Sequence, residues 1–237
     1  MTPPRHPTRR ARRRRVLGPL LVLVLALVVA GAALLPQWTS GAGGPRYVVP
    51  AAELTAARSA LDALPVKGRA PMTGYDRGLF GEAWADVDGN GCDTRNDILA
   101  RDLVGVRVSA GCVVLRGTLN DPYTGQQVAF ARGPQSAEVQ IDHVVALADA
   151  WQKGAQQWTP ARREQFANDP ANLLAVSGAA NQAKGAGDAA TWLPPRTGYR
   201  CAYVLRQVLV KAEYGLWVTA AEHAALERWL GRCVTAT

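Results

Sequence analysis

Histidine is scarce in this chain of 237 residues, which contains only three, so few positions can supply an imidazole. His6 lies in a basic leader, and His223 follows a helix-capping pattern typical of a solvated helix position, which leaves His143. The residue before it is Asp142, and a neutral imidazole can accept a proton from water near pH 7. By itself the Asp-His pair is at least as often structural as chemical.

Polar residues further along the chain favour chemistry. Asn172 opens a short apolar segment, and Asn181 and Lys184 are spaced i, i+3, so they share one helix face. The order strand, loop, strand, helix gathers a carboxylate, an imidazole, an amide oxygen and an ammonium around one point. Oxygen ligands from Asp142 and Asn181 suit Mg²⁺ or Mn²⁺, and Lys184 adds positive charge for a phosphate. The set predicts phosphodiester hydrolysis in which His143 activates water.

A small α+β domain must position these groups. Alternating or continuous apolar residues predict short strands, at 104–108, 112–115, 139–141 and 173–176, with a turn at 120–125. Helical spacing and capping residues predict helices, at 51–64, about 160–168, 177–184, 199–215 and 219–230. Phe80 and Trp84 are expected to anchor the core.

The charge of the chain belongs mostly to its leader. The formal net charge is +8, but seven of the 27 Lys and Arg residues fall within the first 15 positions, and the rest is close to neutral. Residues 16–35 carry no charge and are rich in Leu, Val and Ala, which indicates a signal peptide or a signal anchor. A DNA-binding leader is disfavoured because the adjoining apolar segment needs lipid or a translocon. Residues 36–50 read as a flexible Gly/Pro stalk, and residues 51–73 as a helix and linker.

The cysteines agree with export. All four lie beyond the leader and none forms a C-x-x-C pair, so a four-cysteine zinc site is not expected. Three pairings are possible, and an oxidising compartment favours disulfides over free thiols. The local pairing respects the order of the segments: Cys92 with Cys112, and Cys201 with Cys233.

At this point the sequence resembles the HNH (ββα-metal) nucleases. Asp142-His143 resembles the Asp-His motif at the end of the family's first strand. Asn172-Leu173 resembles the Asn-Leu motif of its second strand, and Asn181-x-x-Lys184-Gly185 resembles the motif of its helix. More closely, the chain resembles secreted bacterial HNH endonucleases related to the C-terminal domain of GmrSD-type restriction nucleases. The further motifs that carry this likeness are Tyr75-x-Arg77-x-x-Phe80-x-x-x-Trp84, Gly91-Cys92-Asp93-Thr94-Arg95, Arg101-Asp102, Ala161-Arg162-Arg163, Trp192-Leu193-Pro194-Pro195 and Tyr199-Arg200-Cys201.

The resemblance implies a ββα-metal core with additional packed helices and a short β-hairpin, over residues 74–237. Carried over by position, Asp142 and Asn181 bind the metal and His143 is the general base. Asn172 supports the loop or binds substrate, and Lys184 is a catalytic residue that contacts phosphate or holds the helix. The chain departs from the pattern because its middle and final positions are Asn, so Mg²⁺ or Mn²⁺ is favoured over a three-histidine site for Zn²⁺ or Ni²⁺.

Two further features have competing interpretations. Residues 86–97 follow a calcium-loop spacing with Asp86, Asp88, Asn90 and Asp97, although the twelfth position is Asp rather than Glu and a cysteine lies inside the loop. The alternative is a polar turn that leads into a helix at Thr94. Arg95 and Arg101 are candidates for binding substrate phosphate, with structural salt bridges as the alternative.

These observations predict an exported metal-dependent endonuclease, tethered to the membrane through residues 16–35 if that segment is not cleaved. The expected substrate is nucleic acid, with DNA favoured over RNA, and no protein partner is implied. Two alternatives remain: a non-catalytic envelope module that binds an anionic polymer, and a hydrolase of another phosphodiester.

Overall fold

The computed structural model describes residues 48–109 and 111–235. The predicted leader at 1–35, including the apolar segment 16–35, lies outside the described residues, as does the predicted stalk up to residue 47. Val49, at the end of that stalk, is 3% exposed and forms a parallel bridge with Thr235. Within the described residues, no helix combines the length and the apolar character needed to cross a membrane.

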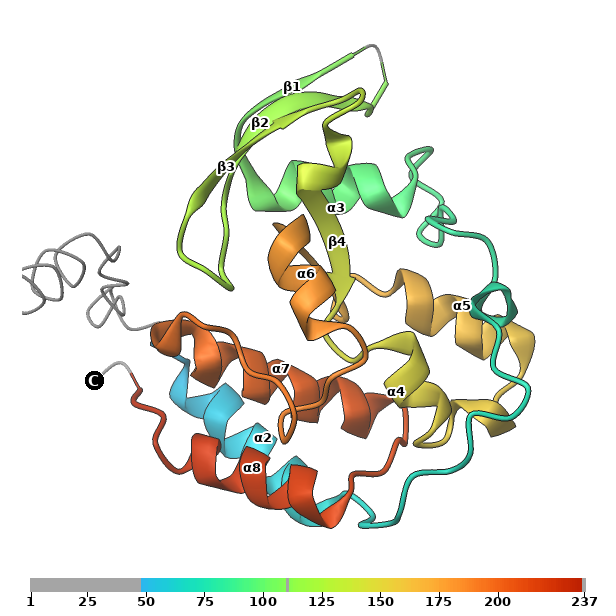
Figure 1. The fold of residues 1–237 in the computed structure, drawn as a ribbon, viewed down its shortest axis with the longest axis vertical. Coiled ribbons are helices and arrows are strands. Elements are labelled where there is room, and N and C mark those ends of the chain that lie inside the picture. The colour runs from blue at the N-terminus through green and yellow to red at the C-terminus, as the bar shows by residue number, and fades with distance from the viewer. Residues whose placement is uncertain (1–47, 110, 236–237) are drawn as a thin grey trace, which may run out of the picture. The chain divides into compact units, whose positions relative to one another are not determined.

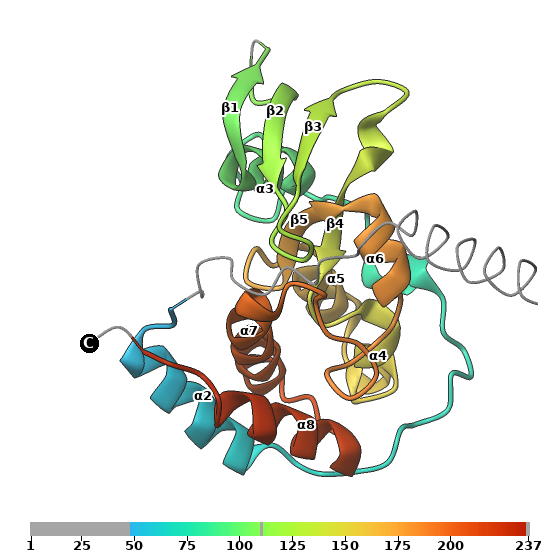
Figure 2. The same ribbon diagram turned by 60° about the vertical axis from the view of Figure 1, so that its left-hand side comes forward.

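Two strands and a helix occupy the centre of the described domain. β4 (Val139–His143) pairs antiparallel with β5 (Leu173–Ser177), and α6 (Gly178–Lys184) follows β5 directly (Figures 1 and 2). The register sets His143 opposite Leu173. Alternate side chains of β5 enter two different hydrophobic clusters, so both faces of the strand are buried. This explains why its sequence is a continuous apolar run rather than an alternating one.

The segment that joins β4 to β5 contributes two helices beside the strand pair (Figure 1). α4 (Leu147–Trp151) follows β4 after a short loop, and α5 (Pro160–Asn168) precedes β5. Thr159 caps α5 as predicted, because its Oγ1 accepts from the Arg162 amide at 3.3 Å and proline occupies the first helical position. α5 thereby brings its last turn against the end of β4.

A second, three-stranded antiparallel sheet packs on α3 (Thr94–Asp102). It consists of β1 (Leu103–Val108), β2 (Val114–Asn120) and β3 (Gln127–Ala131), and it extends away from the helices (Figure 2). The prediction of a half-buried face at 104–108 was wrong. Val104 and Val108 are 52% and 53% exposed because the β1–β2 register shifts on both sides of Arg107.

Three helices form the other side of the domain. α2 (Ala51–Ala63), α7 (Arg200–Glu213) and α8 (Ala220–Leu230) contact one another in pairs (Figures 1 and 2). Their shared core contains Leu61, Tyr203 and Leu226, each at most 2% exposed. The predicted capping box that starts α8 is present, with both reciprocal bonds between Thr219 and Glu222.

Both predicted disulfides are present. Cys92 pairs with Cys112, which ties the segment before α3 to the residues just before β2, and Cys201 pairs with Cys233, which ties the start of α7 to the chain after α8. The described residues contain no free cysteine. Helices and two small antiparallel sheets make the described domain α+β, as predicted.

Candidate active site

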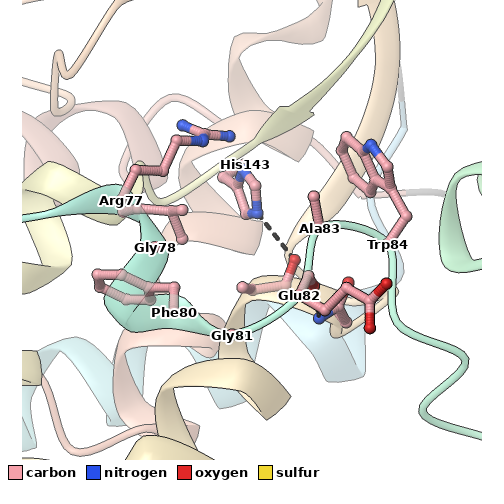
Figure 3. Close-up of a pocket in the computed structure, with 11 residues that line it drawn as sticks. Arg77, Gly78, Phe80, Gly81, Glu82, Ala83, Trp84 and His143 are labelled. Atoms are coloured by element: carbon pink, nitrogen blue, oxygen red, sulfur yellow. Dashed lines mark hydrogen bonds between the residues drawn. The ribbon is translucent and has the colours of Figure 1, made fainter.

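His143 is the last residue of β4, and its imidazole is fixed by one hydrogen bond. The side chain is buried, and its Nε2 lies 2.8 Å from the backbone oxygen of Ala167 in α5 (Figure 3). A carbonyl oxygen only accepts hydrogen bonds, so Nε2 carries the proton and donates it. Nδ1 therefore keeps its lone pair, which is the acceptor that a general base needs.

The surroundings keep this ring uncharged. Burial lowers the pKa of His143 to about 3, and the positive charges of Arg77 and Lys184 lower it further, whereas the bond to Ala167 opposes the shift. At neutral pH the imidazole is a neutral base with a fixed tautomer.

Asp142 is buried beside this histidine and both of its oxygens accept hydrogen bonds. Oδ1 accepts from Lys184 Nζ at 2.8 Å, and Oδ2 accepts from the Tyr123 hydroxyl at 2.5 Å. Burial raises the pKa of Asp142, while the charge and the hydrogen bond of Lys184 and the hydrogen bond of Tyr123 act in the opposite direction. Each carboxylate oxygen can still accept a further contact, because each has a second lone pair.

One pocket brings the predicted metal ligands together with the histidine. It has a volume of about 260 Å³, and its lining includes Asp142, His143, Asn181 and Arg77; we call it the aspartate pocket. The Asn181 amide nitrogen donates to Gln140 Oε1 at 2.9 Å, whereas Asn181 Oδ1 accepts no hydrogen bond from the described residues. The amide oxygen of Asn181 is thus available to a ligand.

Two other predicted site residues are buried and bond to the backbone at the end of β4 and in the loop after it. Asn172 is fully buried and forms two hydrogen bonds to the backbone of Val145, at 2.8 and 3.2 Å, so it supports the loop after β4. Substrate binding by Asn172 stays a prediction. Lys184 is 3% exposed and also donates to the backbone oxygen of His143 at 2.8 Å. Its ammonium joins α6 to the end of β4.

The two arginines predicted to bind substrate have structural contacts. Arg95 donates to the backbone oxygens of Ser136 and Val139, at 3.4 and 3.1 Å. Arg101 forms a bidentate pair with Asp102 and also donates to backbone oxygens before and within β5. Neither lines the aspartate pocket. Phosphate binding by either residue stays a prediction, and it would compete with these contacts.

The calcium prediction for residues 86–97 also has a structural counterpart. Asp86 accepts from the amide of Gly91 at 2.9 Å, and the Asn90 side chain donates to Asp88 at 3.1 Å and to Asp97 at 3.4 Å. These polar groups form the turn before α3. No three His, Cys, Asp or Glu side chains are grouped to hold a metal ion in residues 48–109 and 111–235. Calcium binding here stays a prediction.

Sequence reasoning missed three residues that lie around Asp142 or His143. Tyr123 lies in the predicted turn at 120–125, and nothing in its spacing indicates that it bonds Asp142. Arg77 and Trp84 belong to a motif recognised only as part of a resemblance, and Trp84 was expected to be a core anchor. With His143 they line a second pocket of about 250 Å³, which we call the tryptophan pocket (Figure 3).

Comparison with known proteins places this chain in a family. A protein from the fungus Arthroderma benhamiae, named "Uncharacterized secreted protein", is 40% identical over 179 residues, which cover 75% of this chain and 84% of that protein. The expected restriction to bacterial relatives is therefore not supported. No solved structure matches the chain. Residues 93–229, which include the whole aspartate, histidine and asparagine set, match the family described as "GmrSD restriction endonucleases, C-terminal domain". The chain therefore belongs to the GmrSD restriction endonuclease C-terminal domain family, which indicates a nuclease-type function acting on nucleic acid.

Proposed function

We propose that this protein is an exported, metal-dependent endonuclease of the HNH (ββα-metal) type, which hydrolyses phosphodiester bonds in DNA. The support comes from the order β4, β5, α6, with Asp142 and His143 at the end of the first strand and Asn181 and Lys184 on the helix. Membership of the GmrSD restriction endonuclease C-terminal domain family supports the nuclease class.

In this proposal His143 is the general base. Its Nδ1 takes a proton from the water that attacks phosphorus, and the bond to the leaving deoxyribose oxygen breaks on the opposite side. That oxygen leaves with the bonding electron pair and takes a proton from solvent water. A histidine with a pKa of about 3 is a weak base in the free protein. The anionic phosphate of a bound substrate stabilises the protonated imidazole and so raises that pKa when a base is needed.

The residues of the aspartate pocket fit a hard divalent cation. The carboxylate of Asp142 and the open amide oxygen of Asn181 are oxygen donors of the kind that Mg²⁺ and Mn²⁺ prefer. When bound, such an ion supplies positive charge to the phosphate and to the leaving oxygen. Lys184 and Tyr123 hold the Asp142 carboxylate in position from behind, each through one hydrogen bond.

Export is part of the proposal. Both disulfides require an oxidising compartment, and the fungal relative carries the name of a secreted protein. The predicted leader at 1–35 supplies the means, as a cleaved signal peptide or as an anchor through residues 16–35.

One observation carries the assignment: His143 is held with Nε2 occupied, in a pocket that also contains the proposed ligands Asp142 and Asn181. The test is cleavage of supercoiled plasmid by the purified protein with Mg²⁺. Replacing His143 with Ala should slow cleavage about 100- to 10,000-fold, since a positioned base contributes that much. The matched control His223→Ala, on α8, should leave the cleavage rate unchanged. Excess EDTA should abolish cleavage by the wild-type protein.

The alternatives make different predictions in the same assay. Equal cleavage by wild type and His143→Ala would contradict the mechanism. Retention of DNA or wall polymer without cleavage would favour a binding module. Hydrolysis of a small diester without cleavage of DNA or RNA would keep the site and change the substrate.

A further inference from the structure

The chain segment before α3 builds one wall of a pocket, and this wall lies outside the residues that match the family. Arg77 begins the short 3-10 helix η1 (Arg77–Phe80), and the loop after it carries Trp84; both precede the matched residues, which begin at position 93. The tryptophan pocket that they line is distinct from the aspartate pocket, but His143 and Arg77 line both. The proposed general base therefore stands between two cavities of similar size.

The lining of the tryptophan pocket is mostly aromatic and apolar. It includes Phe80, Trp84 and Leu147, and the Trp84 ring is tilted only 14° from the His143 ring, with 6.2 Å between the ring centroids (Figure 3). Glu82 is the one carboxylate among the lining residues. Flat apolar walls favour a planar base, because every base offers a face for stacking, and the carboxylate disfavours a phosphate inside the pocket.

The backbone holds Trp84 in a conformation that needs support. Its φ of 65° lies in the left-handed region, and Trp84 is the one non-glycine residue with positive φ among the described ranges. For a bulky residue this conformation is uncommon and costly. Thr94, the first residue of α3, fixes it by donating from its amide to Trp84 O at 3.3 Å and from its hydroxyl to Ala85 O at 2.5 Å. The backbone that carries the Trp84 ring is thus held in place before any ligand arrives.

Arg77 supplies charge at the boundary of the two pockets. It is exposed, and its guanidinium makes no hydrogen bond or ion pair to any other described residue. Its positive charge is close enough to lower the pKa of His143. An unpaired guanidinium is suited to bidentate contact with a phosphate. Arg77 contrasts with Arg95 and Arg101, whose donors are used by the protein itself.

The pocket also offers polar contacts to the edge of a base. Asn168 is 1% exposed, and its amide nitrogen donates to the backbone oxygens of Glu164 and Glu82, at 3.0 and 3.4 Å. Its Oδ1 accepts no hydrogen bond from the described residues, so it is open to a donor. A volume of about 250 Å³ lies just below the range of about 300–1,000 Å³ that drug-sized ligands occupy, and suits a single base.

We infer that the tryptophan pocket binds the nucleobase next to the scissile phosphate, stacked against Trp84, while Arg77, which lines both pockets, binds that scissile phosphate. This inference rests on the proposed nuclease function and adds a base-binding subsite to it. The aspartate pocket then takes the scissile phosphate, and His143 faces both parts of the bound nucleotide. Trp84 and Arg77 are substrate-binding residues in this arrangement.

Binding without cleavage tests the inference directly. Labelled single-stranded DNA and an abasic strand of equal length are titrated against the full-length protein in EDTA, with fluorescence anisotropy as the readout. Wild type should bind the normal strand more tightly. Trp84→Ala should weaken binding of the normal strand about fivefold or more and leave the abasic strand unaffected, because stacking of one base on an aromatic ring contributes at least that much.

Arg77→Ala should behave differently from the tryptophan variant. It should weaken binding of both strands by the same factor, because its proposed contact is to phosphate. It should also reduce the slope of log affinity against log salt concentration by about 0.7, the value for one single-stranded phosphate contact. The matched control Trp229→Ala, on α8, should change neither affinity nor slope.

The outcomes separate this inference from the proposed function. Equal affinity of wild type for normal and abasic strands, or an unchanged ratio in Trp84→Ala, overturns the subsite even if cleavage depends on His143. Absence of any His143-dependent cleavage overturns the proposed function instead. If Trp84→Ala does not fold, Trp84→Leu keeps an apolar side chain of substantial volume and must still reduce the ratio of the two affinities.

Discussion

At the residue scale, the burial of His143 makes a prediction about stability. An unfolded histidine has a pKa of about 6.5, whereas burial lowers the pKa of the folded one to about 3. Below about pH 6.5 the unfolded chain therefore binds a proton that the folded chain does not. This contribution to stability is fully present above pH 6.5 and is lost as pH falls toward 3, with a slope of about 1.4 kcal/mol per pH unit in the free energy of unfolding.

The measurement is urea unfolding in EDTA between pH 4 and pH 6, for wild type and for His143→Gln. The glutamine amide nitrogen can take the place of the histidine Nε2 and donate toward Ala167, but it does not titrate, so the variant should lack this part of the slope. The raised pKa of Asp142 acts in the opposite direction, since its folded form keeps a proton that the unfolded form has lost. That effect is common to both proteins, so the difference between their slopes isolates the histidine; parallel curves would contradict the assignment.

The sequence was informative about some site residues and silent about others for a physical reason. Elimination among three histidines and the i, i+3 spacing on a helix were enough to predict that Asp142, His143 and Asn181 meet, and one pocket contains all three. The part played by an arginine depends on which backbone oxygens the folded chain brings near it. Spacing therefore could not show that Arg101 bonds β5 while Arg77 has no hydrogen-bond or ion-pair partner among the described residues.

At the element scale, the position of α6 depends on a glycine without a side chain. A Cβ on Gly178, the first residue of α6, would lie 2.4 Å from the backbone oxygen of Ala137 and 3.0 Å from the Gln140 side chain. Since backbone cannot move as freely as a flexible side chain, Gly178→Ala must displace the start of α6. That start sets the position of Asn181 and Lys184 relative to β4.

We expect Gly178→Ala to lower the free energy of unfolding by about 1–3 kcal/mol, the cost of overpacking, and to reduce plasmid cleavage as well. Gly68→Ala is the matched control, because no atom of residues 48–109 and 111–235 lies within 4 Å of a Cβ built there and its φ is not positive. It should be neutral or slightly stabilising. Chemical denaturation and the plasmid assay check both; a Gly178→Ala protein as stable and active as the control would show that α6 is not fixed in this way.

Some helices and strands could be predicted from the sequence, and others could not. Helix starts with local capping signals, such as Thr159 and Thr219, were predicted correctly because the cap and its partner are three residues apart. β3 was not predicted, and the expected face of β1 was wrong. Both features depend on pairing with β2. The shifts of the β1–β2 register near Arg107 cannot be read from the alternation of residues alone.

At the scale of the whole molecule, the described domain is held together by buried charge as well as by apolar packing. Three acids, Asp149, Asp188 and Glu222, contact three cations, Lys153, Lys211 and Arg69, and the five residues other than Arg69 are at most 1% exposed. The network joins α4, α7, α8, the linker after α2 and the loop after α6. Burial raises the pKa of Asp149, but Lys211 and Lys153 outweigh it, and the pKa lies below its usual value.

Lys153 is the centre of this network, and its removal gives a test of the whole fold. Its ammonium is fully buried and lies within 2.5 to 2.8 Å of carboxylate oxygens of Asp149, Asp188 and Glu222. Lys153→Met keeps the length of the side chain but leaves an uncompensated negative charge in the interior. Because breaking a buried ion pair on one side is expensive, we expect a loss of about 3–5 kcal/mol in the free energy of unfolding.

Chemical denaturation at pH 7 measures this loss, with Lys67→Met as the matched control. Lys67 is exposed and its ammonium lies over the ring of Trp217, while its backbone bond to Val218 does not depend on the side chain, so the control should change stability by less than about 1 kcal/mol. Adding Glu222→Gln to Lys153→Met restores the charge balance and should recover part of the loss. A Lys153→Met protein as stable as the control would mean that the apolar clusters alone hold α4, α7 and α8 together. The position of the loop from His143 to α4 would then not depend on the buried charge network.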